Sequence, residues 1–168
     1  NMASKLGLIS FNPQTDDSLV ADLLKLLKTA EIDMTLFYRE LADLDFNNPR
    51  KSFQMLLQTC SYTLLNNEVK QMADCWLADY QQRLKVDNWS YQQRRAVMNA
   101  VNPKYVLRNY LAQQAIDKAE QGDFSGVNEL LEILRRPYDE QEGKQQFAEK
   151  RPDWAKQRAG CSMLSCSS

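Results

Sequence analysis

Apolar residues recur at intervals of three and four positions along most of the chain, which is the period of an amphipathic α-helix. No segment of strand length alternates apolar and polar residues, so the pattern predicts an all-α fold. The apolar stripes run over residues 19–30, 36–44, 53–64, 69–84, 106–115 and 127–134.

Residues that favour helix starts and stops lie between these stripes. Side-chain oxygens cap the first turn of a helix, a proline is tolerated in that turn, and a serine with a glutamine three positions later forms a capping box. Residues 1–137 are therefore expected to form an irregular helical bundle of about six to seven helices, without a repeat period. The start signals are Asp16–Ser18, Asp33, Asn48–Pro49, Ser90 with Gln93, and Asn102–Pro103, and Pro137 is a stop.

The sequence changes character after Pro137. Residues 139–146 are polar and have no period, which is typical of a loop or a mobile segment. Trp154 is expected to anchor this stretch by burying its indole. Residues 138–168 are therefore predicted to form an extended, mobile tail that ends in Ser-Cys-Ser-Ser.

Composition restricts the classes of partner. The chain has 21 basic and 22 acidic side chains, a net charge of -1 and a pI near 5.6. Its bulk charge therefore does not attract nucleic acid or acidic lipid. No apolar run is long enough to cross a bilayer, and the first residues lack the apolar region of a signal peptide. We expect a soluble globular protein with no nucleic-acid partner and no membrane partner.

No catalytic constellation is visible in the sequence. Histidine is absent, which removes the commonest general base and the usual partner of a nucleophilic serine or cysteine. No glycine-rich phosphate loop or other catalytic motif occurs. Carboxylates at Asp16–Asp17 and at Asp43 and Asp45 could hold magnesium, but helix caps and loop solvation explain them equally well. The arginine doublets 94–95 and 135–136 are also better explained by helix structure.

Cysteine supplies the candidate chemistry. The four cysteines form no C-x-x-C pair, and so few of them indicate a reducing compartment. Cys60 and Cys75 lie on or near apolar stripes and are predicted to be inert, small apolar side chains. Cys161 and Cys166 lie in the polar tail, where an exposed thiol can oxidise, so they are the redox candidates.

Tryptophan supplies the candidate interface anchors. Trp76 shares an apolar stripe with Met72 and Tyr80, so we assign it to the core. Trp89 lies in a loop and Trp154 in the tail. An indole with one apolar face and one polar N–H group suits an interface, so both are possible anchors.

The second half of the chain resembles a known family, the selenoprotein O family, in its C-terminal region. The motifs occur in the family's order, whereas residues 9–100 fit the family mainly in helical character. The first stretch reads Val-Asn-Pro-Lys-Tyr-Val-Leu-Arg-Asn-Tyr-Leu-Ala-Gln over residues 101–113. The other matching segments are residues 5–8, 115–117, 119–123, 137–138, 152–155 and 165–168.

The resemblance implies a specific chemistry for a longer protein. Members of the family have a kinase-like (pseudokinase) part that binds ATP in a flipped orientation with magnesium or manganese. They transfer AMP to Ser, Thr or Tyr hydroxyls of protein substrates. Their catalytic and metal-binding residues lie N-terminal to the matched region, and no position of this chain matches them. The resemblance thus implies a helical C-terminal segment with no catalytic, cofactor or metal residue of its own, whose partner is the kinase-like part.

The resemblance also gives the terminal thiol a role. Animal members carry selenocysteine at the third residue from the end, where this chain has Cys166. This implies redox control through a disulfide with a thiol of the kinase-like part. Cys161 is outside the family motif, and a Cys161–Cys166 pair is the alternative. The chain departs from the family at Arg151, which precedes a single proline where two are common.

Three hypotheses follow. The leading one is the C-terminal helical domain of a protein adenylyltransferase, which supports the kinase-like core and carries a regulatory thiol. The second is a freestanding helical protein-interaction module that uses a groove near Trp89 or near the last helix pair. The third is a small thiol switch without further activity. The implied location is the cytoplasm in a bacterium and the mitochondrion in a eukaryote.

Overall fold

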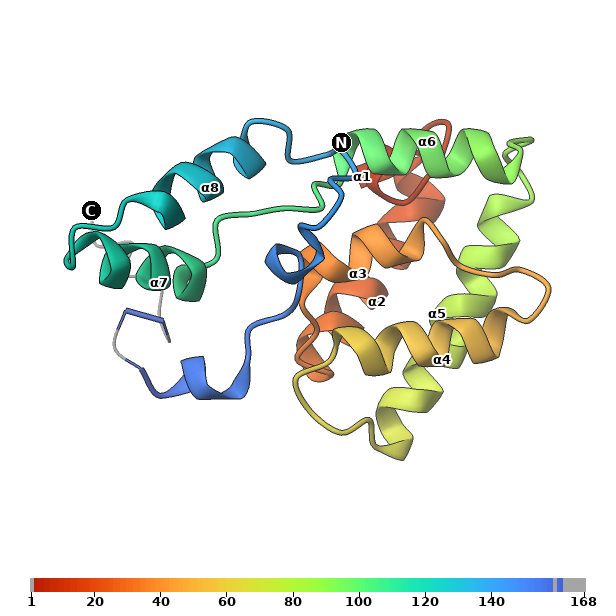
Figure 1. The fold of residues 1–168 in the computed structure, drawn as a ribbon. Helices are drawn as coiled ribbons and strands as arrows, with labels where there is room; N and C mark the ends of the chain where they lie inside the picture. Colours follow the sequence, from red (N-terminus) through yellow and green to blue (C-terminus); the bar gives the residue numbers. More distant parts are fainter. Residues whose placement is uncertain (1, 159, 162–168) are drawn as a thin grey trace. The chain divides into compact units, whose positions relative to one another are not determined.

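The computed structural model describes residues 2–158, 160 and 161, which form α-helices joined by loops (Figure 1). These residues pack as two compact units, one extending to Asn102 and the other beginning at Pro103. In the described part of the chain, the only β-type pairing is an isolated bridge between Ile32 and Ser61. The all-α prediction is confirmed.

The first unit is a bundle of α-helices. α2 packs against α5, α4 packs against both α3 and α5, and α6 contacts α1 and α3. The helices are α1 (Met2–Lys5), α2 (Pro13–Thr29), α3 (Met34–Leu41), α4 (Pro49–Cys60), α5 (Asn67–Leu84) and α6 (Tyr91–Val101).

Aromatic rings fill the centre of this bundle. The Trp76 ring stacks on Tyr80 at 4.8 Å and on Phe53 at 5.3 Å between centroids. The Trp76 indole N–H donates to the carbonyl of Leu19 at 2.9 Å, and the Tyr80 hydroxyl donates to the carbonyl of Leu6 at 2.7 Å. Both of these buried donors therefore have a partner, and α5 is tied both to α2 and to the segment after α1. The assignment of Trp76 to the core is confirmed.

Several predicted helix starts are confirmed. Asp33 accepts from the Leu36 N–H at 3.0 Å, and α4 begins at Pro49. Ser90 and Gln93 form the reciprocal capping box. The predicted start of α2 at residues 16–18 is wrong, because the helix begins three residues earlier, at Pro13, with Asn12 as its cap.

The third apolar stripe is shorter than predicted. α4 ends at Cys60, and Leu64 is 98% exposed. The chain turns here because the Ser61 hydroxyl donates at 2.7 Å to the carbonyl of Ala30, while the Asp33 N–H donates to the carbonyl of Cys60. These tertiary bonds end the helix where the apolar pattern alone would have continued it.

The second unit is built around a pair of helices, α7 (Asn109–Ala119) and α8 (Ser125–Leu134), that pack on each other. The helix predicted to begin at Pro103 begins at Asn109 instead. The reason is tertiary: the N–H groups of Lys104 and Tyr105 both donate to the carbonyl of Pro137, at 2.8 and 3.1 Å. Residues 103–108 are therefore held outside a helix beside the end of α8.

The segment after Tyr138, predicted as an extended tail, contains two short 3₁₀ helices, η1 (Gln145–Phe147) and η2 (Asp153–Lys156). It contributes to a second, small core in which Phe147 is partly buried. The buried members of this core are Tyr110, Leu111, Ala115, Leu130, Ala155 and Cys161.

The apolar face of α8 is divided in a way that the sequence pattern did not predict. Leu130 and Ile133 are buried, as an inward face requires. Val127 and Leu131 belong to the apolar stripe predicted over residues 127–134, but both are exposed. The apolar stripe of α8 is therefore wider than the surface that α7 covers.

Candidate functional site

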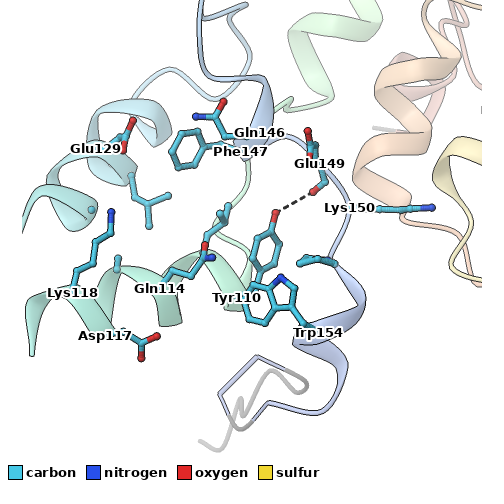
Figure 2. Close-up of a pocket in the computed structure, with 15 residues that line it drawn as sticks. Tyr110, Gln114, Asp117, Lys118, Glu129, Gln146, Phe147, Glu149, Lys150 and Trp154 are labelled. Atoms are coloured by element: carbon cyan, nitrogen blue, oxygen red, sulfur yellow. Dashed lines mark hydrogen bonds between the residues drawn. The ribbon is translucent and has the colours of Figure 1, made fainter.

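A groove of about 620 Å³ lies on the second unit, between α7, α8 and the segment that carries η1 and η2 (Figure 2). Its floor is apolar, from Leu111, Ala115 and Leu130, and the aromatic rings of Tyr110, Phe147 and Trp154 line it. The remaining lining residues are Gln114, Asp117, Lys118, Gly126, Glu129, Gln146, Glu149, Lys150 and Pro152.

Close helix packing and one edge contact shape this groove. A Cβ added at Gly126 would lie 3.3 Å from the Ala115 Cα atom, so glycine lets α8 approach α7 closely. The Tyr110 ring meets the Trp154 ring edge-to-face at 6.1 Å between centroids. The Tyr110 hydroxyl donates to the carbonyl of Glu149 at 3.4 Å, which links α7 to the η1–η2 segment (Figure 2).

The charges around the groove are both acidic and basic. Asp117 accepts from the Gln113 amide at 3.0 Å and pairs with Arg158. The hydrogen bond from Gln113, followed by the interaction with Arg158, lowers the pKa of the Asp117 carboxyl. At the opposite wall, Lys144 pairs with Glu129 at 2.6 Å. Aromatic faces beside charges of both signs suit a protein segment better than a phosphate group.

Trp154 and Trp89, the two predicted anchors, lie in different units. Trp154 was expected to bury its indole, but it is 47% exposed and it is the neighbouring Ala155 that is buried. Trp89 lines a smaller pocket of about 360 Å³ with Phe46 and Tyr91. The role of each as an interface anchor stays a prediction.

Arg94 closes the base of the Trp89 pocket. Its guanidinium group lies 5.0 Å from the Phe46 ring centroid, and it donates to the carbonyls of Leu41 and Ala42 at 3.3 and 3.1 Å. The adjacent Arg95 pairs with Asp43. Arg94, Arg95 and Asp43 therefore already bond to other groups of the protein.

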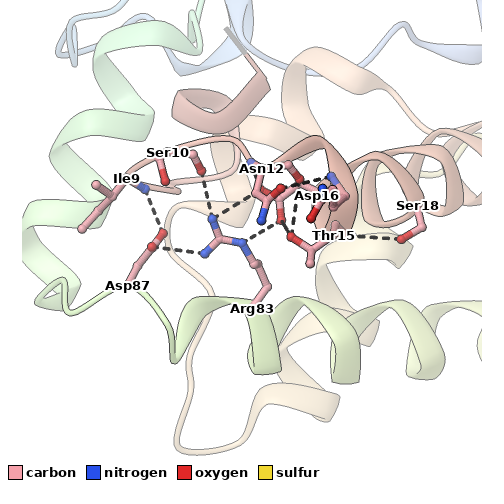
Figure 3. Close-up of polar contacts among 9 residues, drawn as sticks. Ile9, Ser10, Asn12, Thr15, Asp16, Ser18, Arg83 and Asp87 are labelled. Carbon is pink, nitrogen blue, oxygen red and sulfur yellow. Dashed lines mark hydrogen bonds and ion pairs between the residues drawn. The ribbon is translucent and has the colours of Figure 1, made fainter.

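Arg83 forms ion pairs and hydrogen bonds that join α5 to the start of α2 (Figure 3). Its guanidinium group pairs with Asp16 at 2.7 Å and with Asp87 at 3.1 Å, and donates to the carbonyl of Ser10 at 2.9 Å. Asp16 is fully buried, although the sequence suggested a cap or a magnesium ligand. Burial opposes ionisation of Asp16, but the hydrogen bonds from Arg83 and from the Asn12 N–H hold its pKa below the ordinary value.

The thiols are placed differently from the prediction. Cys60 is buried, as expected, but Cys75 is exposed on α5. Cys161 was predicted to be exposed, yet it is buried in the second core. A turn buries it: the Cys161 N–H donates to the carbonyl of Arg158, and Gly160 takes a φ of +79°. Cys166 lies outside the described residues.

The groove residues could not be found from the sequence as a set. Tyr110 belongs to the apolar stripe predicted over residues 106–115. Phe147 directly follows the polar residues 139–146 and was assigned no role. Trp154 alone among the three rings was predicted as an interface anchor, and Phe147 gave a further signal as a lone large apolar residue among polar neighbours. The partners come from segments that are distant in sequence, so only the fold brings them together.

Across residues 2–158 and 160–161, no group of three or more His, Cys, Asp or Glu side chains is arranged to bind a metal ion. No helix formed by these residues is both long and apolar enough to cross a membrane.

Comparison with known proteins identifies the family. The sequence profile described as Protein adenylyltransferase SelO matches residues 1–135. Proteins described as Protein nucleotidyltransferase YdiU, from Rhodopirellula baltica and Aromatoleum aromaticum, are each 51% identical to the chain over 99% of its length. A protein of the same description from Xanthomonas euvesicatoria pv. vesicatoria is also 51% identical, again over 99% of the chain. The chain spans about a third of the length of these curated relatives, 33%, 31% and 32% respectively. The family resemblance seen in the sequence is thereby confirmed, and the chain belongs to the protein adenylyltransferase SelO family.

Proposed function

We propose that this chain is the C-terminal helical part of a protein adenylyltransferase that transfers AMP from ATP to Ser, Thr or Tyr hydroxyls of protein substrates. One observation carries the proposal: the chain is 51% identical over nearly its whole length to proteins described as nucleotidyltransferases, yet spans only about a third of them. The ATP, its magnesium or manganese ion and the catalytic residues would belong to the kinase-like part, in the remaining two thirds.

The contacts of the described residues support a structural role for this segment. Arg83 and Arg94, two largely enclosed arginines of the first unit, are already bonded to protein carboxylates and carbonyls. A phosphate group would have to displace these bonds to reach them. We therefore expect the segment to hold the kinase-like part in place and to transfer no AMP by itself.

We further propose that Cys166 is a regulatory thiol. Its thiol would form a disulfide with a cysteine of the kinase-like part: each thiol loses a proton, and the pair gives two electrons to an oxidant such as hydrogen peroxide, which becomes water. The burial of Cys161 supports this pairing over a Cys161–Cys166 bond, because an enclosed thiol is a poor partner for exchange. A reducing agent would reverse the step.

The test is AMP transfer from labelled ATP to a protein acceptor, detected by mass spectrometry. The full-length polypeptide, with the kinase-like part present, is compared with this chain alone at equal concentration and with magnesium or manganese. We expect incorporation only with the full-length polypeptide. Incorporation by this chain alone, or none by the full-length polypeptide with either metal, contradicts the proposal.

The thiol is tested in the full-length polypeptide by treatment with peroxide before the transfer assay. Cys166→Ser is expected to abolish the difference in rate between the oxidised and reduced enzyme. Cys161→Ser is the matched control, because it removes a thiol five positions away that is buried. Loss of the redox effect in Cys161→Ser, with the effect retained in Cys166→Ser, would assign the switch to the other thiol.

The second candidate function, a helical interaction module, is favoured by the Trp89 pocket, where two further aromatic rings stand beside a half-buried indole. If this pocket binds a protein segment, Trp89→Ala weakens binding to that segment and Asn88→Ala, in the same loop, does not. We also place the full-length protein in the cytoplasm, on the low cysteine count and the bacterial sources of the relatives. Cell fractionation tests this location.

A further inference from the structure

The second unit exposes more apolar surface than its own core explains. In the described residues from Pro103 onward, eight apolar side chains are buried and seven large ones are exposed. A unit of this size is marginal by itself, because small domains bury too little surface to offset chain entropy. The exposed residues are Leu107, Ile116, Phe124, Val127, Leu131, Tyr138 and Trp154.

Three of these residues form a continuous stripe on α8. Phe124, Val127 and Leu131 follow one another at spacings of three and four, so they lie on one side of the helix. They are 60%, 42% and 49% exposed. The buried Leu130 and Ile133 mark the adjacent face that meets α7. We call the three residues the α8 stripe.

Two carboxylates beside the stripe are already paired within the unit. Glu132 pairs with Arg135 on the same helix at 2.8 Å, and Glu129 pairs with Lys144 at 2.6 Å. A charged partner would gain little here, because its attraction would compete with existing ion pairs. The stripe therefore selects apolar side chains.

We infer that the α8 stripe is covered by the part of the same polypeptide that lies outside this chain, through apolar side chains of the kinase-like part. The inference rests on the proposed function, since it takes the family's remaining two thirds to be the occupant. The length of the relatives supports that choice, because the chain spans only 31–33% of them. A covalently joined part is present at high effective concentration and covers an apolar face more readily than a free partner.

The test uses hydroxyl-radical footprinting, which modifies exposed apolar side chains and is read by mass spectrometry. Trypsin cleavage after Lys118 and Arg135 releases residues 119–135, which contain the whole stripe. We expect modification of Phe124 and Leu131 to be several-fold lower in the full-length polypeptide than in this chain alone. Equal modification overturns the inference. Protection already present in this chain alone, whether it is a monomer or a dimer in solution, also overturns it.

A pair of variants gives a second readout. Val127→Glu places a charge on the stripe, and Asn128→Glu places the same charge one position away on an exposed polar face. We expect Val127→Glu to lower the unfolding temperature of the full-length polypeptide more than Asn128→Glu does. In this chain alone the two should be equal. Equal effects in the full-length polypeptide would contradict the inference.

The footprinting experiment and the AMP-transfer assay can refute the docking inference and the proposed function separately. If the full-length polypeptide transfers AMP while the stripe stays fully modified, the docking inference is wrong and the proposed function stands. If the stripe is protected but no AMP is transferred, the surface is assigned correctly and the proposed function is wrong.

Discussion

Gly7 is the position at which one added methyl group is expected to destabilise the first unit most. Its φ is +68°, in the left-handed region that favours glycine. A Cβ atom there would lie 2.6 Å from Arg94 Cγ and 2.8 Å from Met98 Sδ. Gly7→Ala therefore meets both a backbone penalty and a collision.

Neither neighbour can move away easily. The Arg94 guanidinium group is held by the carbonyls of Leu41 and Ala42, and Met98 is fully buried. A non-glycine residue in the left-handed region costs about 1 kcal/mol, and overpacking of a tight site costs about 1–3 kcal/mol. We expect Gly7→Ala to lower the free energy of unfolding of the first unit by about 3 kcal/mol.

Gly122→Ala is the matched control. Gly122 also has a positive φ, +84°, but no atom lies within 4 Å of its added Cβ. Gly122→Ala should therefore lower the free energy of unfolding only through the backbone penalty, by about 1 kcal/mol. Because the two glycines lie in different units, unfolding in urea is followed by hydrogen exchange resolved to individual peptides. If Gly7→Ala destabilises its unit no more than Gly122→Ala does, the steric argument is refuted.

Three further predictions concern buried polar groups and thiols. Burial raises the pKa of Tyr80 to about 12, against an ordinary value of 10.0, so the stability that it contributes is complete below pH 10 and is lost as the pH rises toward 12. Tyr80→Phe should remove this alkaline loss, about 3 kcal/mol, in denaturation curves measured from pH 9 to 12. The pKa of Asp16 is lowered, so its contribution is present above about pH 3.8 and falls as the pH drops further. Asp16→Asn should lower the free energy of unfolding at pH 7 by about 2–3 kcal/mol, because Arg83 loses one of its two carboxylate partners. The variant should also lose less stability than the parent as the pH falls below about 3.8, and an unchanged loss of stability in acid would contradict this. A thiol reagent should modify Cys75 rapidly and Cys161 only after unfolding, as measured by peptide mass spectrometry; equal rates would show that Cys161 is accessible.

The helix starts that were predicted correctly are those with a short-range sequence signal. The cap at Asp33, the start at Pro49 and the Ser90–Gln93 capping box depend on residues at most three positions apart. Such signals are readable in a sequence because both partners are close together in it.

The errors occur where a distant partner decides the local structure. The segment after Pro103 carries helix signals, but two of its N–H groups bond to the carbonyl of Pro137. Asp16 was explained as a cap because Arg83, its partner 67 positions away, could not be seen from the pattern. The site was not recognised as a set for the same reason, since its aromatic residues come from α7 and from the distant η1–η2 segment.

The two units differ in how their stability is supplied, and this bears on the proposed regulation. The first unit has a large aromatic core and the buried ion pair and hydrogen bonds of Arg83 and Arg94, so we expect it to keep its structure by itself. The second unit has a small core and an exposed α8 stripe, so its order depends more strongly on what covers it. A disulfide formed by Cys166 would restrain the chain a few residues beyond this second core. A restraint changes the folded fraction most where intrinsic stability is least, so redox control at Cys166 would act mainly through the second unit and its docking to the kinase-like part.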